Sequence, residues 1–199
     1  NNRKIFCPRG KMIGGCSSHN GMVFVRGNPL DFERWASHDL PKWSYKHVLP
    51  YFKKLETWSG GENLYRGGNG PLKVNRSKTD EAFPLKKSLI KAAAEAGFDI
   101  FDDSNGFKQD GFGTFDVTID NGKRQGVSRA YLNEVKGHKN LSIEHNTDFS
   151  KIIFKEKKAI GVEIKRDNNS EIYYCNKEVI LSSGSINSPK ILQLSVFAL

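Results

Sequence analysis

A glycine-rich segment near the start of the chain, residues 8–27, is the first candidate for chemistry. Five of its twenty residues are glycine, and small polar residues stand between them. Because glycine has no Cβ, the backbone at Gly14 and Gly15 can approach a bound molecule closely. The segment therefore predicts a loop that contacts a ligand through its backbone and its short polar side chains.

A second candidate lies near the other end, where a Ser-Gly-Ser turn at 183–185 follows an apolar run at 178–182. The run predicts a strand buried on both faces. Ser188 suits the N-cap of a following helix, and Pro189 suits its first position. A strand, a glycine turn and a helix N-terminus present free backbone N–H groups to an anion. One coherent hypothesis is that both glycine loops touch the same anionic ligand.

The better-known catalytic and nucleotide-binding motifs are missing from the chain. Gly111-Phe112-Gly113 lacks the third glycine of a dinucleotide fingerprint, and there is no Walker loop and no G-x-S-x-G elbow. None of the five histidines stands at metal-ligand spacing from Cys or Glu, so no metal site is expected. Asp102 and Asp103 could be an acid–base pair, but such a pair before Ser-Asn-Gly is more often a turn. The catalytic residue stays unknown.

Composition and charge limit the class of protein. The 199 residues carry 31 Lys and Arg against 22 Asp and Glu, a net charge of +9. This excess could serve an anionic partner, but runs of like charge are too short for a nucleic-acid arm, so we expect no nucleic-acid partner. No apolar stretch reaches the ~20 residues of a membrane span.

The cysteine count and the chain ends bear on location and completeness. Three cysteines, an odd number, favour a reducing compartment, and the chain opens without a secretory signal. We therefore expect a cytoplasmic protein, with peripheral attachment to a membrane as the alternative. The chain opens without Met and closes within an apolar helical pattern, so we also expect it to be an internal fragment of a longer protein.

The elements between the two loops predict an α/β fold of mixed, α+β character. Residues 28–58 predict two helices. Asn28 and Pro29 suit the N-cap and first position of one, and Ser44 suits the N-cap of the other. Pro50 predicts a kink or a late start in the second helix, whose expected apolar side consists of Val48, Tyr51, Phe52 and Leu55.

Further elements are expected in the second half of the chain. Leucine and alanine at helical spacing predict a third helix over 81–96, closed by Gly97. Alternating apolar residues predict a hairpin with its turn at 156–158 and a further strand at 172–175.

Two long stretches resemble the signature motifs of the glucose–methanol–choline (GMC) oxidoreductase family. Residues 9–22, followed by Arg26-Gly27-Asn28, are similar to the first signature, and 184–195 are similar to the start of the second. Colinear stretches between them that also resemble the family are 43–45, 49–52, 68–71, 110–113 and 128–132. The resemblance covers essentially the whole chain and is strongest to the family's choline dehydrogenases and choline oxidases.

The resemblance implies a partial FAD-binding Rossmann-like domain and part of an antiparallel-sheet substrate or cap domain. It assigns 1–27 and 141–199 to the FAD-binding domain and 28–140 largely to the cap. Family members bind FAD and oxidise a primary alcohol by hydride transfer to flavin N5, and choline is the expected substrate, giving betaine aldehyde. The catalytic region is expected downstream of Leu199, so the fragment alone is expected to be inactive.

The resemblance also implies which residues contact FAD. Positions that match the family's cofactor contacts are Met12, Ile13, Gly14, Gly15, Cys16, His19, Asn20, Gly21, Met22, Val23 and Phe149. Ser17 and Ser18 are expected to offer hydrogen bonds to the cofactor as well. Phe149 stands where the family usually has a valine whose backbone meets the adenine, and a phenylalanine there would crowd the pocket.

A more specific expectation, covalent attachment of the flavin, concerns His19. Residues 14–20 match those of choline oxidases, in which this histidine is joined covalently to the flavin. A neutral imidazole nitrogen is a competent nucleophile for that bond. The alternative is a hydrogen bond without covalent attachment, and Gly21, where choline oxidases have serine, shows that the match is incomplete.

Functions besides choline oxidation stay open at this point. The chain could be a non-catalytic binding or structural remnant of the scaffold, or it could belong to an enzyme for another aliphatic or aryl alcohol. Oxidase and dehydrogenase are not distinguished, because the electron acceptor is unknown.

Overall fold

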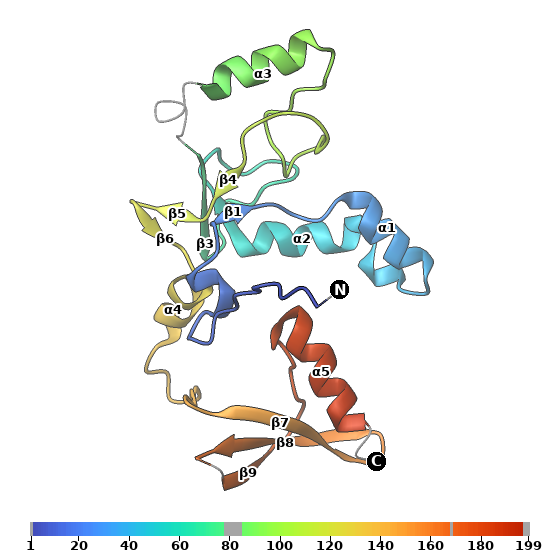
Figure 1. Ribbon diagram of the computed structural model, residues 1–199, viewed down its shortest axis with the longest axis vertical. Coiled ribbons are helices and arrows are strands. Elements are labelled where there is room, and N and C mark those ends of the chain that lie inside the picture. The colour runs from blue at the N-terminus through green and yellow to red at the C-terminus, as the bar shows by residue number, and fades with distance from the viewer. Residues whose placement is uncertain (1, 78–84, 168, 197–199) are drawn as a thin grey trace. The chain divides into compact units, whose positions relative to one another are not determined.

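The computed structural model describes residues 2–77, 85–167 and 169–196, and the chain divides into two compact units (Figure 1). The first unit is Asn1–His138 and the second is Lys139–Leu199. Helices and strands occur in both, so the expected mixed fold class is confirmed.

Two helices follow the glycine-rich segment. Helix α1 spans Pro29–Ser37, with Pro29 at its first position and the Asn28 side chain accepting a hydrogen bond from the Leu30 N–H at 2.9 Å. Asn28 is therefore the N-cap, as predicted.

Helix α2 spans Tyr45–Leu55, after the short 3₁₀ helix η2 at Pro41–Trp43. Ser44 occupies its N-cap position, but the Ser44 hydroxyl bonds His47 Nδ1 instead of capping the helix. Pro50 lies inside the helix, so the late start is wrong. Tyr51, expected on the apolar side, is 71% exposed.

Helix α3 spans Leu85–Glu95 and ends as predicted. Gly97 has a φ of +84°, which favours glycine, and its N–H donates to the Ala94 carbonyl at 3.0 Å. The Phe98 N–H donates to the Ala93 carbonyl at 3.0 Å, which completes a Schellman motif. Residues 81–84 of the expected helix lie outside the described residues.

The first unit contains a small mixed sheet in the order β1-β4-β3-β2. Its strands are β1 (Val23–Phe24), β2 (Glu56–Trp58), β3 (Leu72–Arg76) and β4 (Asp116–Val117). β2 and β3 pair in parallel, and the other pairs are antiparallel. Its apolar core is small: Leu72 and Val74 of β3 pack with Ala130 of the π-helix η3 (Ser128–Leu132), followed by α4 (Asn133–Val135).

A two-strand hairpin extends from this sheet (Figure 1). It pairs β5 (Ile119–Asp120) with β6 (Lys123–Arg124) in antiparallel register. Its turn is Asn121-Gly122, with φ values of +48° and +70°, the backbone of a type I′ turn. The amide Nδ2 of Asn75 on β3 donates to the Ile119 carbonyl at 2.6 Å, which ties the hairpin to the sheet.

Buried charges form a second core in the first unit, which no local sequence pattern predicts. Arg66 is fully buried and donates to Glu56 from Nε at 2.8 Å and to Asp116 from Nη1 at 2.7 Å. Nη1 also donates to Asp103 at 2.6 Å. The Arg66 guanidinium lies over the Trp58 ring, 4.4 Å from its centroid. Asp103 is thus an ion-pair partner and a turn residue, not half of an acid–base pair.

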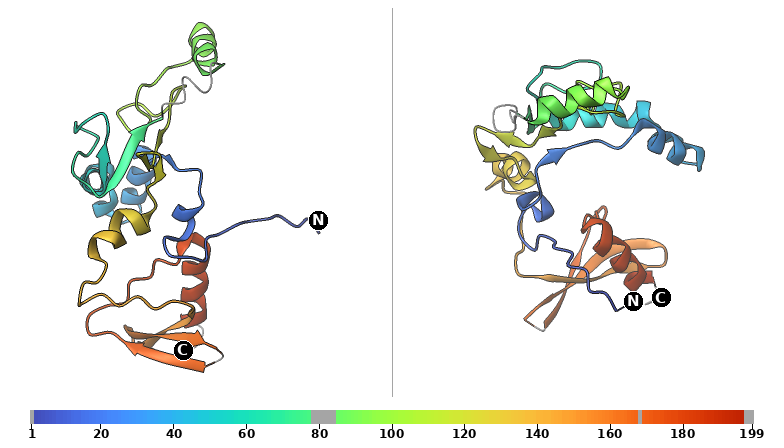
Figure 2. Two further views of the ribbon diagram at one scale, coloured as in Figure 1. Left: turned by 90° about the vertical axis from the view of Figure 1, so that its left-hand side faces the viewer. Right: turned by 45° about the horizontal axis from the view of Figure 1, so that its top comes forward.

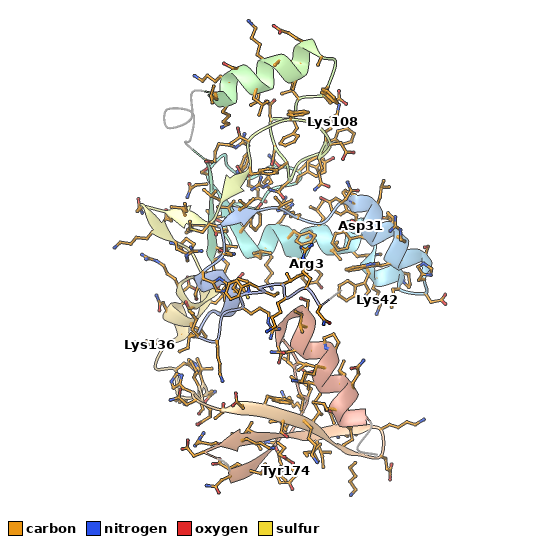
Figure 3. All side chains as sticks on the ribbon, in the orientation of Figure 1. Arg3, Asp31, Lys42, Lys108, Lys136 and Tyr174 are labelled. Carbon is orange, nitrogen blue, oxygen red and sulfur yellow. The ribbon has the colours of Figure 1, made fainter. Side chains whose placement is uncertain are left out.

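The second unit is a three-stranded antiparallel sheet covered on one face by a helix (Figures 1 and 2). Its strands are β7 (Asp148–Lys155), β8 (Lys158–Arg166) and β9 (Asn169–Tyr174), so the predicted hairpin and third strand are confirmed. β9 is an edge strand, and its Tyr174 is 72% exposed (Figure 3).

Helix α5, Gly184–Val196, packs against β7. Ile191 is buried with Ile152 of β7 and Ile164 of β8. Ser195 links helix and strand, since its Oγ accepts from the Ile152 N–H at 2.8 Å and donates to the Ile191 carbonyl at 2.6 Å.

Two predictions near this helix are wrong. Residues 178–182 form no strand, and Ile180 is 79% exposed, because the described part of the chain supplies no strand to pair with them. The helix begins at Gly184, so Ser188 is not its N-cap and Pro189 lies inside it. Ser188 Oγ instead accepts from the Ser183 N–H at 3.0 Å.

Candidate functional site

The glycine-rich segment forms an exposed loop whose backbone favours glycine at Gly14 and at Gly15, which both have a positive φ. Gly14 has a φ of +91°, and a Cβ there would lie 2.5 Å from Ser18 Oγ. The 3₁₀ helix η1 follows at Gly15–Ser18. A Cβ added at Gly15 or Gly21 would meet nothing within 4 Å. The backbone at Gly15 and Gly21 is therefore open to the close approach of a ligand.

The loop's two serine hydroxyls are used inside the loop. Ser17 Oγ donates to the Gly14 carbonyl at 2.6 Å, and Ser18 Oγ donates to the Ile13 carbonyl at 2.9 Å. Both hydroxyl hydrogens are therefore used within the loop, and the expectation that the two serines offer hydrogen bonds to the cofactor stays a prediction. Their role is to hold the turn at Gly14.

Residues about a hundred positions later hold the loop from outside. The Val127 N–H donates to Ser17 Oγ at 3.0 Å, and the Thr118 N–H donates to the Met22 carbonyl at 2.8 Å. Arg124 Nη1 contacts both oxygens of Asn20 at 2.7 Å. No local sequence pattern indicates these anchors, although the family-like stretch at 128–132 directly follows them.

The structure brings together the expected cofactor residues from positions 12 to 23. Met12, Ile13 and Val23 are 57%, 48% and 55% exposed. Residues of the loop that are also exposed are Cys16, His19, Asn20 and Gly21, and those that are half-buried are Gly14, Gly15 and Met22. Exposed apolar side chains grouped on one loop are typical of an interaction site.

Phe149 belongs to the second unit. It lies on β7, opposite Ile164 of β8, and is half-buried. Its backbone is thus part of an antiparallel ladder.

The strand that leaves the loop is held by buried polar groups. The Arg26 N–H donates to Asn105 Oδ1 at 2.7 Å, and Asn105 Nδ2 donates to the Phe24 carbonyl at 3.1 Å. Arg26 Nη2 pairs with Glu56 at 2.7 Å. The Asn105 amide therefore bonds β1 and the residues after it as a neighbouring strand would.

Burial and neighbouring charges shift the pKa values of the groups in this cluster in opposite directions. Burial lowers the pKa of Arg26, and the Glu56 carboxylate opposes that change. Burial also disfavours the Arg66 cation, but hydrogen bonds to Glu56 and Asp116 outweigh it and raise the Arg66 pKa above its ordinary value. Burial raises the pKa of Tyr45, with Arg26 opposing it.

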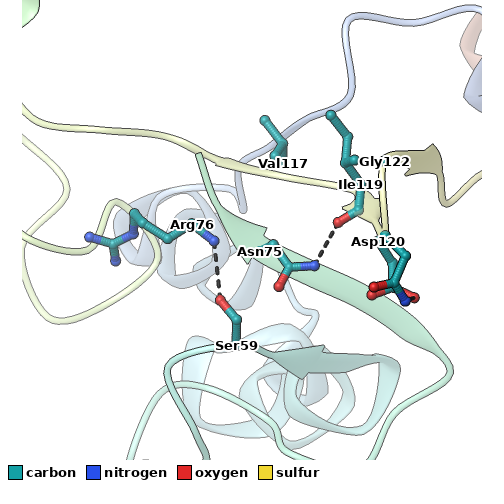
Figure 4. Close-up of a pocket in the computed structure, with 8 residues that line it drawn as sticks. Ser59, Asn75, Arg76, Val117, Ile119, Asp120 and Gly122 are labelled. Atoms are coloured by element: carbon teal, nitrogen blue, oxygen red, sulfur yellow. Dashed lines mark hydrogen bonds between the residues drawn. The ribbon is translucent and has the colours of Figure 1, made fainter. Parts of the chain in front are cut away.

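A cavity of about 750 Å³ lies beside this cluster in the first unit (Figure 4). Its lining residues are Ser59, Asn75, Arg76, Val117, Ile119, Asp120, Asn121 and Gly122. None of them is an expected cofactor residue. Arg76 is committed to Asp116, with Nε 2.8 Å from the carboxylate, so the described lining residues offer no free cation for catalysis.

Metal ligands and membrane spans are both missing from the part of the chain that the structure describes. Within 2–77, 85–167 and 169–196, no group of three His, Cys, Asp or Glu residues is placed to hold a metal ion. Over the same ranges, no helix has the length and hydropathy needed to cross a membrane.

Comparison with known proteins points to one family. The family profile described as "GMC oxidoreductase" matches residues 1–198. The chain is 43% identical over 193 residues to the oxygen-dependent choline dehydrogenase of Photobacterium profundum, and the match covers 97% of this chain and 34% of that protein. It is 44% identical over 193 residues to the mitochondrial choline dehydrogenase of Homo sapiens, covering 97% of this chain and 32% of that protein.

The fold is also similar to that of solved FAD-dependent oxidoreductases. An FAD-dependent oxidoreductase from Chaetomium thermophilum superposes with a TM-score of 0.89 at 31% identity, covering 98% of this chain and 36% of that one. The chain thus spans about a third of the length of the relatives that it matches.

Proposed function

Since this chain belongs to the GMC oxidoreductase family of FAD-dependent enzymes, we propose that the protein carrying it oxidises choline to betaine aldehyde. The proposal extends to the whole protein what the names of the relatives say of them, because several are choline dehydrogenases at 43–46% identity. FAD, when bound, would accept the hydride from the alcohol carbon.

The observation that supports this function is the loop over residues 12–23, whose conformation is held by hydrogen bonds within the loop and from residues 124 and 127. FAD carries a pyrophosphate and a polar ring edge, which need close backbone approach and hydrogen-bond donors. The loop has both, since the backbone at Gly15 and Gly21 is open and Asn20 is exposed. The exposed side chains of Met12 and Ile13 can cover apolar cofactor surface and exclude water.

The two-domain assignment is part of the same proposal. Residues 1–27 and 141–199 contribute to the FAD-binding domain, with Phe149 meeting the cofactor through its backbone. Residues 28–140 contribute largely to the cap on the substrate side. The residues of this chain hold and orient the cofactor, and the proton-accepting group is expected beyond Leu199.

His19 is the candidate for covalent attachment of the flavin. It follows η1 at the end of the loop, its side chain is exposed, and its N–H donates to the Cys16 carbonyl at 3.2 Å. An exposed imidazole can reach a ligand held by the same loop. Acid precipitation of the full-length protein tests the bond: flavin that stays with the wild-type pellet and leaves the His19→Asn pellet supports it, and flavin that washes out of the wild type refutes it.

The test of the function uses the full-length protein purified from its natural reading frame. We expect a flavin absorbance spectrum that choline bleaches without oxygen, and choline-dependent reduction of a dye. Oxygen consumption in place of dye reduction would identify an oxidase. A full-length protein that holds no flavin, or whose flavin choline does not reduce while another primary alcohol does, would contradict the assignment to choline.

A further inference from the structure

Arg124 places a positive charge against the loop that carries His19. It lies on β6, and its Nη1 is 2.7 Å from the Asn20 carbonyl, 2.7 Å from Asn20 Oδ1 and 3.3 Å from the Ser17 carbonyl. All three acceptors are neutral. Among the described residues, no carboxylate lies within ion-pair distance of Arg124. Hydrogen bonds from a charged donor are stronger than neutral ones.

These contacts decide which way the Asn20 amide points. Asn20 Oδ1 accepts from Arg124 and also from the Met22 N–H at 3.0 Å. Only the oxygen of an amide can accept two donors, since the NH₂ group donates. Nδ2 of the exposed Asn20 side chain must therefore point away from Arg124. In the part of the chain that the structure describes, Nδ2 has no acceptor.

We propose that Arg124 is a positioning residue that orients Asn20 so that its NH₂ group donates to an oxygen of the bound flavin nucleotide. This inference rests on the proposed function, because FAD is the ligand that the loop is taken to hold. It assigns a task to Arg124, which does not itself belong to the loop.

The hairpin is a firm base for this task. Its type I′ turn at Asn121-Gly122 suits a two-residue connection, and Asn75 ties Ile119 to the sheet at 2.6 Å. Arg124 stands opposite Ile119 in the register, and it is half-buried. Lys123 precedes Arg124 on the same strand, points to the opposite face and is exposed, so it is a matched control of equal charge.

The test compares four variants of the full-length protein in a His19→Asn background, where flavin remains exchangeable. They are Arg124→Met, Arg124→Lys, Lys123→Met and Asn20→Asp. The affinity of the apoprotein for FAD and the hydrogen exchange of peptides covering 14–23 are measured for each. Asn20→Asp keeps both acceptor contacts, replaces the NH₂ group by oxygen and adds a negative charge, so its FAD affinity is measured at low and at high salt to separate the lost donor from the added charge.

We expect Arg124→Met to bind FAD about 10- to 100-fold more weakly than Lys123→Met, the effect of losing charge-assisted hydrogen bonds. Its loop peptides should also exchange faster. Compared with Arg124→Met, Arg124→Lys should regain part of the FAD affinity and part of the loop's protection from exchange, since lysine restores the charge but not the planar guanidinium. Asn20→Asp should weaken FAD binding at least about 10-fold at both salt concentrations with loop exchange no faster, because high salt screens charge repulsion but does not restore the lost NH₂ donor.

Equal FAD affinity in Arg124→Met and Lys123→Met would overturn the inference. So would an Asn20→Asp variant that binds FAD as tightly as its parent. If the wild-type protein binds no FAD at all, the proposed function fails. The exchange comparison in the apoprotein then decides separately whether Arg124 holds the loop.

Discussion

Replacing Glu56 by glutamine tests the buried charge cluster of the first unit. Glu56 has no exposed surface, and it accepts hydrogen bonds from Arg26, from Arg66 and from the Gly67 N–H at 3.0 Å. Glutamine has nearly the same shape. The substitution therefore removes the charge, and it turns one acceptor oxygen into a donor that faces a guanidinium.

The charge balance of the cluster sets the size of the effect. Its charged members are Arg26, Arg66, Arg76, Glu56, Asp103 and Asp116, three cations and three anions. Glu56→Gln leaves one buried positive charge uncompensated. Removing one partner of a buried pair costs about 3–5 kcal/mol. For a unit of this size, that lowers the melting temperature by roughly 10 °C or more.

The assay is thermal unfolding of the full-length protein, with Glu62→Gln as the matched control. Glu62 is 56% exposed and pairs with Lys53 at 3.4 Å, and such surface pairs contribute only about 0–1 kcal/mol. A Glu56→Gln protein that melts within about 2 °C of the Glu62→Gln protein would refute the reasoning. Failure to recover folded Glu56→Gln protein under conditions that yield the control agrees with it.

Three further predictions concern other parts of the chain. Gly14→Ala should lower flavin content, because alanine at a φ of +91° is strained by about 1–2 kcal/mol and its Cβ would clash with Ser18 Oγ. Ser195→Ala should destabilise the second unit by about 1–3 kcal/mol in urea unfolding, because it leaves the buried Ile152 N–H without an acceptor. Burial raises the pKa of Tyr45, so the stability that it contributes is present below about pH 10 and is lost as pH rises through the higher folded pKa. Tyr45→Phe should therefore lose less stability than the wild type above about pH 10 in pH-dependent unfolding.

Each of these predictions has a control and a contrary result. Gly61→Ala has a similar φ of +87° but meets open space outside the loop, so it should retain more flavin than Gly14→Ala, and the reverse order would count against the geometry of the loop. Ser188→Ala removes only an exposed contact, and a cost equal to that of Ser195→Ala would show that the buried link to β7 is unimportant. Identical alkaline unfolding of wild type and Tyr45→Phe would show that Tyr45 does not titrate with unfolding.

The sequence by itself determined the features that depend on a few neighbouring residues. Asn28 and Pro29 set the start of α1, because the cap bond joins residues two positions apart. Gly97 set the end of α3, because its conformation is nearly closed to other residues. The loop over 12–23 was also recognisable, since its glycines and polar residues form one continuous signature.

Only the tertiary structure decided the features that need a distant partner. The apolar run at 178–182 has strand composition, but a strand forms only where another strand can pair with it. Glu56 and Arg66 look like ordinary surface residues until the fold removes them from water together. Arg124 and Asn20 are more than a hundred residues apart, and no local pattern can reveal that the hairpin's guanidinium sets the direction of the Asn20 amide.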